Sequence, residues 1–235
     1  MVSGEHQLMR SLVRGLELLL PTAAVPLAAY LWLTEVLWIG PSNYVQQIDL
    51  AEPPSDWGKA EHVYQHLSNL QSYSPWDARL ARAKGVIMIT LSRFSGNTTE
   101  ERFAYLLQGM KDLTSARLIN GRDGKSDAYL ALAHLLNGSS AALVEYHLHA
   151  AVRKRPIDSS VQRLVVLVGL YRWDELSEGL RGSLQREFEF ALRLDAKWVI
   201  NTAIQAERER LLIPFTKPGS WRRYHLEKGR LFDHS

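Results

Sequence analysis

One stretch of the sequence carries the residue types that hold nucleotide phosphates. Residues Gly121 to Asp127 read GRDGKSD and contain a Gly-Lys-Ser triplet. A phosphate-binding loop also needs a glycine five positions before Gly124 and a preceding β-strand. Here position 119 is isoleucine, and the preceding segment has the apolar spacing of a helix. The stretch therefore predicts a turn between two helices and not a nucleotide site.

Histidines near the middle of the chain could in principle bind a metal ion. The sequence EYHLH places Glu145, His147 and His149 close together. Two histidines on one helix share a zinc ion when they are three or four residues apart, because they then face the same side. His147 and His149 diverge by about 200° on a helix, so a zinc site needs a third ligand such as His134. We expect one histidine at the surface, the other packed between helices, and no metal.

Acidic residues occur in pairs, and paired carboxylates are what glycoside hydrolysis uses. The pairs are Asp174 with Glu175, Glu187 with Glu189, and Glu207 with Glu209. The reaction needs two carboxylates about 5–10 Å apart across one cleft, whereas residues one or two apart on a helix do not converge. The chain also has no cysteine and no nucleophile-elbow motif. We therefore expect a protein that is not an enzyme and has no cofactor.

The C-terminal stretch TKPGSWRRYHLEKGR carries five basic residues and one glutamate, with aromatic residues among them. Guanidinium groups beside aromatic rings suit anionic sugars, lipid head groups or acidic protein surfaces. The residues predicted to bind a partner here are Trp221, Arg222, Arg223 and Tyr224. The alternative is a solvated tail in which Trp221 covers the last helix of the domain. The formal net charge of +3 is too small to favour nucleic acid as a partner.

The N-terminal part of the chain predicts a membrane anchor. From Leu18 to Ile39 there are 22 residues, of which Glu35 alone is charged. As a helix this run is about 33 Å long, enough to cross a hydrocarbon core of about 30 Å. A signal peptide has a shorter apolar region, which ends at its cleavage site. A cleaved signal peptide and a buried helix of a soluble protein are the alternatives.

The flanking charges predict the orientation of this anchor. Arg10 and Arg14 precede the apolar run, and no Lys or Arg follows it before Lys59. The positive-inside rule then places the tail, residues 1–17, in the cytoplasm and everything after residues 18–39 across the membrane. Residues 40–56 are rich in Pro, Ser, Asn and Asp and predict a linker. The expected location is the inner membrane, with a single span and a periplasmic C-terminal domain.

Residues 57–213 predict an all-α domain, because nearly every segment has helical periodicity and none has a convincing strand pattern. Four predicted helices share an aspartate at their start, a position that suits the free amides and the positive end of the helix dipole. These residues are Asp77, Asp127, Asp158 and Asp195, spaced by 50, 31 and 37 positions. A second helix follows each of the first three. The order predicts helical hairpins stacked as a solenoid, with a non-repetitive bundle as the alternative.

The end of one predicted hairpin resembles a known repeat. In SSAALVEYHLHAAVRKRPID, Ala151 lies five residues before Pro156, which resembles the end of the second helix of a tetratricopeptide repeat. The resemblance implies a stack whose groove is lined by the first helix of each hairpin. Arg82 and Arg163 each lie five residues after a start aspartate, and we predict that both contact a partner. The segment after residue 213 is then a basic and aromatic tail, residues 214–235.

The whole layout is similar to small anchored helical-repeat proteins that accompany exopolysaccharide or O-antigen assembly in Gram-negative bacteria. That similarity implies a non-catalytic scaffold that organises a polysaccharide polymerase or export complex, with an inner-membrane or periplasmic protein as its partner. A module that binds anionic glycan and a periplasmic glycan-processing enzyme are the alternative functions.

Overall fold

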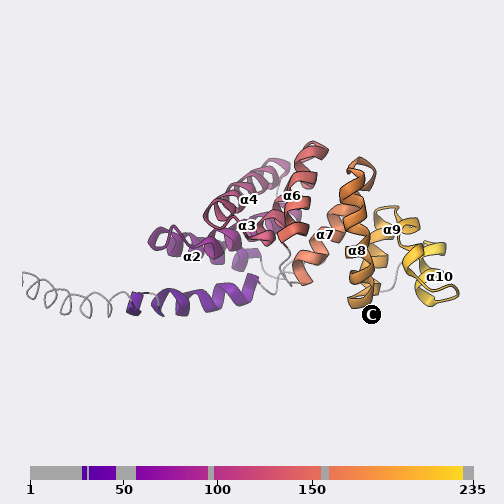
Figure 1. Cartoon of the computed structure of the whole chain (residues 1–235). Coiled ribbons are helices and arrows are strands. Elements are labelled where there is room, and N and C mark those ends of the chain that lie inside the picture. Colours follow the sequence, from indigo (N-terminus) through magenta and orange to yellow (C-terminus); the bar gives the residue numbers. More distant parts are fainter. Residues whose placement is uncertain (1–27, 31, 46–56, 95–97, 155–158, 230–235) are drawn as a thin grey trace, which may run out of the picture. The chain divides into compact units, whose positions relative to one another are not determined.

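The computed structural model describes residues 28–30, 32–45, 57–94, 98–154 and 159–229. These residues form helices and turns, with no β-strand among them, so the predicted all-α class is confirmed (Figure 1). The chain divides into two compact units, residues 1–48 and 49–235. Each unit is described by itself.

The described part of the first unit is helical over residues 28–30 and 32–45. Residues 40–45 of the predicted linker continue the helix. The tail at residues 1–17, residues 18–27 of the predicted span and linker residues 46–56 lie outside the described residues. Among the helices described here, none combines the length and the apolar character that crossing a bilayer requires.

The second unit consists of nine α-helices and three short 3₁₀ turns within the described residues. The α-helices are α2 (Trp57–Tyr73), α3 (Ala78–Phe94), α4 (Thr99–Ile119), α5 (Gly124–Leu136), α6 (Ala141–Lys154), α7 (Ser159–Tyr171), α8 (Glu178–Leu194), α9 (Ala196–Gln205) and α10 (Trp221–Lys228). The 3₁₀ turns are Trp173–Glu175, Glu209–Leu211 and Ile213–Phe215. Substantial contacts join α-helices that are adjacent or two apart in the chain.

Several helix starts follow from local sequence. Asp77 precedes α3 and accepts a hydrogen bond from the Arg79 amide at 2.9 Å, and Asp195 caps α9 through the Trp198 amide at 3.3 Å. Both predicted starts are confirmed. Thr98 and Glu101 form a reciprocal capping box at the start of α4.

Other predicted boundaries are corrected by the structure. The cap of α5 is Asp123, which accepts from the Lys125 amide at 3.1 Å, so Asp127 lies inside the helix. The helical periodicity of DELSEGLRGSLQREFEFALRL predicts a helix from Asp174, but Asp174 lies in a 3₁₀ turn and α8 begins at Glu178. The predicted C-terminal tail contains helix α10. Asp158 lies outside the described residues.

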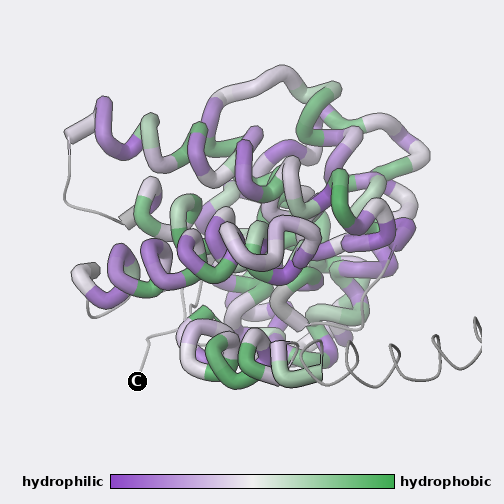
Figure 2. Tube along the Cα trace, turned by 90° about the vertical axis from the view of Figure 1, so that its left-hand side faces the viewer, coloured by the Kyte–Doolittle hydropathy of each residue, from purple (hydrophilic) through white to green (hydrophobic). Residues whose placement is uncertain are grey.

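The closest helix packing is between α3 and α4, where two glycines face each other. A methyl group on Gly85 would lie 2.5 Å from Leu113 Cγ and 3.0 Å from the Gly109 carbonyl oxygen. A methyl group on Gly109 would lie 2.9 Å from Ile89 Cδ1. Bands of hydrophobic and hydrophilic residues alternate along the helices in Figure 2, which lets each helix bury one face against its neighbours.

Polar contacts between helices two apart align the helix ends along two edges of the unit. Arg82 of α3 binds Asp123 at the start of α5 at 2.6 Å. Arg163 of α7 binds Asp195 at the start of α9 at 2.6 Å. We call the edge where α3, α5, α7 and α9 begin the odd-start edge.

The opposite edge holds the first residues of the even-numbered helices. Glu145 of α6 accepts from the Ser177 amide, the cap of α8, at 3.0 Å. The end of α7 reaches the start of α6 through Arg172, which donates to the Ser139 carbonyl at 3.2 Å. We call this the even-start edge.

Candidate functional site

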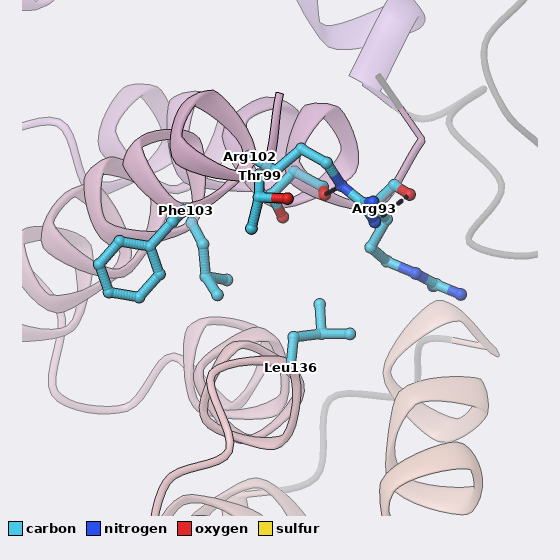
Figure 3. Close-up of a pocket in the computed structure, with 7 residues that line it drawn as sticks. Arg93, Thr99, Arg102, Phe103 and Leu136 are labelled. Carbon is cyan, nitrogen blue, oxygen red and sulfur yellow. Dashed lines mark hydrogen bonds between the residues drawn. The ribbon is translucent and has the colours of Figure 1, made fainter. Parts of the chain in front are cut away.

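A pocket opens on the even-start edge, between the start of α4 and the end of α5. Its volume is about 350 Å³. Figure 3 shows Phe103 and Leu136 on either side of an open space, with Arg93 at one end. The lining residues are Ser92, Arg93, Thr99, Arg102, Phe103, Leu106 and Leu136.

The backbone at the pocket is fixed by Arg102, which lies in the first turn of α4. Its Nε donates to the Ser92 carbonyl at 2.9 Å and its Nη2 donates to the Arg93 carbonyl at 3.2 Å. These carbonyls are among the last of α3, which have no partner inside the helix, and a cation suits this negative end of the helix dipole. Arg102 therefore joins the two helices that form one side of the pocket.

Arg93 places a cation at one end of the pocket. Burial lowers the pKa of its guanidinium, and the nearby Tyr171 acts in the opposite direction. A guanidinium stays protonated in proteins, so this end of the pocket carries a positive charge. No carboxylate is among the described residues that line the pocket.

The apolar part of the pocket is partly open to solvent. Phe103 is 51% exposed and Leu136 is 40% exposed, while Leu106 is buried. The polar lining adds two hydroxyls, Ser92 and Thr99. The arrangement can bind a group that is both apolar and anionic.

A second polar cluster is buried between α4, α5 and α6, around Asp127. This carboxylate is fully buried. It accepts from Lys154 at 2.5 Å and His147 at 3.1 Å, and Arg117 lies 3.3 Å away. Burial alone raises the pKa of Asp127, but the hydrogen bonds from His147 and Lys154, with the charges of Lys154 and Arg117, lower it overall.

The histidines are placed as the sequence predicts. His147 is buried and His149 is exposed. His134 stacks on His147 with 5.2 Å between ring centroids, and burial followed by the charge of His147 lowers the pKa of His134. No group of three or more potential metal ligands is found among the described residues.

The predicted partner-binding residues fall into two separate places. Arg82 and Arg163 take part in the ion pairs to Asp123 and Asp195, and the Arg163 guanidinium also lies 5.4 Å from the centroid of the Trp198 ring. Their observed contacts hold helices together.

The other predicted residues lie on α10, which packs against α9 and the 3₁₀ turns before it. Trp221 is 49% exposed and Tyr224 is 47% exposed. Arg222 lies over the Trp221 ring at 5.3 Å, and Arg223 binds Glu227 at 2.6 Å. Leu226 is buried and holds this helix on the unit.

Three of the paired acidic residues make separate ion pairs with arginines. Asp174 binds Arg208 at 2.5 Å, and Glu175 binds Arg172 at 2.7 Å. Glu189 binds Arg193 at 2.5 Å. Nothing in these contacts brings two carboxylates together across the pocket.

Comparison with known proteins adds no relative. No protein-family model matches the chain, and no curated protein or solved structure shows significant similarity to it. The geometry of the pocket and of the surrounding surface is therefore the basis for assigning a function.

The sequence signals for the pocket were weak. Arg93, Phe103 and Leu136 come from three different helices and share no motif. The one local signal was the capping box that begins with Thr98, which fixes where α4 starts and so where Arg102 and Phe103 lie.

Proposed function

We propose that the protein is a non-catalytic scaffold or adaptor that docks a segment of a partner protein in the pocket between α4 and α5. The observation that carries this proposal is a pocket lined by the basic residue Arg93 together with the partly exposed Phe103 and Leu136. A peptide with an acidic group next to an apolar side chain offers both an anion and a group to cover the apolar wall. A sugar acid offers only the anion.

The proposed architecture is a tetratricopeptide-like stack of helical hairpins. Two features of the described residues support it. Substantial contacts join helices no more than two apart, as expected when each repeat packs only on its neighbours. The same Arg–Asp contact joins α3 to α5 and α7 to α9. A non-repetitive bundle would bring together helices that are distant in the chain.

The proposed location is the inner membrane, with the helical unit in the periplasm. Support comes from the apolar run of residues 18–39 and from Arg10 and Arg14 before it. The partner is then an inner-membrane or periplasmic protein of a polysaccharide polymerase or export complex, as the similarity in layout implies.

The test is co-purification of the tagged full chain after gentle detergent extraction. We expect one reproducible companion, which is lost with Arg93→Gln and with Phe103→Ser. Hydrogen bonds to charged groups contribute about 1.5–3 kcal/mol, so Arg93→Gln should weaken binding at least tenfold. Leu143→Ser is the matched control, because Leu143 is 46% exposed on the same edge and does not line the pocket. Recovery of the chain without a companion, or equal loss with the control variant, contradicts the proposal.

A second candidate function is binding of anionic glycan by α10. The specific observation is the stacking of Arg222 on Trp221 beside the half-exposed Tyr224, since an aromatic face and a cation suit a charged sugar. We expect salt-sensitive binding to an acidic polysaccharide that Trp221→Ala and Arg222→Ala both reduce and Arg93→Gln does not. Binding that is unchanged at high salt contradicts this alternative.

A further inference from the structure

The odd-start edge of the second unit carries several large apolar side chains with high exposed fractions. Tyr73 and Trp76, in the turn before α3, are 67% and 66% exposed. Leu118 at the end of α4 is 81% exposed, and Leu194 at the end of α8 is 60% exposed. Exposed apolar side chains mark an interaction surface when they gather on one face of a protein.

Ion pairs between the helices bring these turns together. The contact of Arg82 with Asp123 joins the first turns of α3 to the turn that follows Leu118. The contact of Arg163 with Asp195 does the same for α7 and the turn that follows Leu194. The apolar side chains therefore belong to three turns that lie on one edge of the unit.

Exposed charges are divided unequally between the two edges. The exposed carboxylates of residues 57–220 all lie near the start of an even-numbered helix or just after an odd-numbered helix. They are Glu61, Glu100, Glu101, Asp174, Glu175, Glu178 and Glu207. They therefore belong to the even-start edge. The exposed cations of the odd-start edge are Arg122, Arg153, Arg193 and Lys197, of which Arg193 is paired with Glu189. Exposed cations also occur on the even-start edge, where Lys59 and Arg102 lie beside the carboxylates.

The aspartates of the odd-start edge serve as helix caps and are paired with arginines. Asp77, Asp123 and Asp195 each accept hydrogen bonds from a helix amide and from an arginine. Asp123 is buried, and Asp77 and Asp195 are partly exposed. Capping thus neutralises these carboxylates and leaves exposed cations beside aromatic and aliphatic groups.

We propose that the odd-start edge docks on the surface of an anionic lipid bilayer. Trp and Tyr favour the depth of the lipid head groups, where one end of the side chain is apolar and the other polar. Leu118 and Leu194 add apolar area, and Lys or Arg near an anionic surface favour binding by a factor of about five each. An acidic protein partner would match the exposed cations. It would also need a separate apolar site for the exposed side chains of each turn, whereas a bilayer covers all of them at once. This proposal does not depend on the pocket.

The experiment uses the full chain, which has no cysteine, with one cysteine introduced for a fluorophore that responds to its environment. Gly121→Cys places the probe on the odd-start edge beside Arg122, and Gly179→Cys places it on the even-start edge at the start of α8. A side chain at either glycine meets nothing within 4 Å. Each labelled chain is reconstituted into phosphatidylcholine vesicles with or without about one-third phosphatidylglycerol, an anionic fraction high enough to attract basic residues.

We expect the probe at position 121 to be quenched by bromine-labelled lipid in the anionic vesicles and to lose that quenching at high salt. The probe at position 179 should respond little in either vesicle. In the Gly121→Cys background, Leu118→Ser should reduce quenching, and Arg122→Glu should weaken docking more than fivefold.

Equal quenching of the two probes, or quenching at position 121 that ignores anionic lipid, overturns the proposal. Absence of quenching together with protection of position 121 by an added protein fraction also overturns it, and identifies the edge as a protein interface. Resistance of the chain to alkaline carbonate extraction tests the anchor separately.

Discussion

The buried carboxylate Asp127 gives the sharpest test of how the second unit is held together. Asp127→Ala leaves Lys154, His147 and Arg117 without the group that lies 2.5, 3.1 and 3.3 Å from them. Removing one partner of a buried ion pair costs about 3–5 kcal/mol, because the remaining charge stays desolvated. In a chain of this size each kcal/mol changes Tm by about 2–4 °C. The expected fall in Tm is therefore about 6–20 °C.

The assay is thermal unfolding followed by circular dichroism, with Glu189→Ala as the matched control. Glu189 binds Arg193 four residues away in an exposed pair, which contributes about 0.3–0.5 kcal/mol. Adding Lys154→Met to Asp127→Ala should recover about 0.5–3 kcal/mol relative to the sum of the two single effects. If Asp127→Ala lowers Tm no more than the control, the reasoning about this cluster is wrong.

The stabilisation that Asp127 provides should depend on pH. Burial alone raises the pKa of Asp127, but its hydrogen bonds and cationic neighbours lower it overall. A depressed carboxyl pKa means that the stabilisation is present above the unfolded pKa of about 3.9 and is lost as pH falls through the folded value. The difference in stability between the wild type and Asp127→Ala should therefore persist at pH 5–8 and narrow below about pH 4.

Two further predictions concern packing and histidine protonation. Gly85→Ala should lower the free energy of unfolding by about 1–3 kcal/mol, because the added methyl group would meet Leu113. Gly182→Ala lies on an open face of α8 and should raise the free energy of unfolding by about 0.4–1 kcal/mol. Equal effects of the two substitutions in urea unfolding would contradict the close contact at Gly85. His134 has its pKa lowered by burial and by the charge of His147, so its contribution is present above the unfolded value of about 6.5 and is lost as pH falls through the lower folded value. His134→Gln should then flatten the loss of stability between pH 7 and 5, and an unchanged slope would exclude this cause.

Much of the helical framework followed from local sequence signals. The starts at Asp77 and Asp195 were predictable because an aspartate that caps a helix acts on amides two or three residues ahead. The error at Asp127 has the same origin. Asp123 and Asp127 both precede apolar runs, and local pattern does not tell which of them is the cap and which is buried among cations from other helices.

The functional surfaces were less predictable. Trp221 and Tyr224 were singled out because they are aromatic residues within a basic stretch, and both are half-exposed on α10. The pocket residues Arg93, Phe103 and Leu136 had no such signal, since they are separated in sequence and meet only where three helix ends converge. Arg82 was noticed for its equivalence to Arg163, and the structure adds that each contacts the cap of a later helix.

The sequence by itself determined that the chain is helical and where several of its helices begin, because periodicity and capping act within a few residues. Only the tertiary structure decided which charges are buried, which carboxylates are used as caps, and which edge keeps its carboxylates exposed. Those outcomes depend on contacts between different helices, such as that of Lys154 with Asp127 and that of Arg82 with Asp123. Local spacing carries no information about distances of that kind.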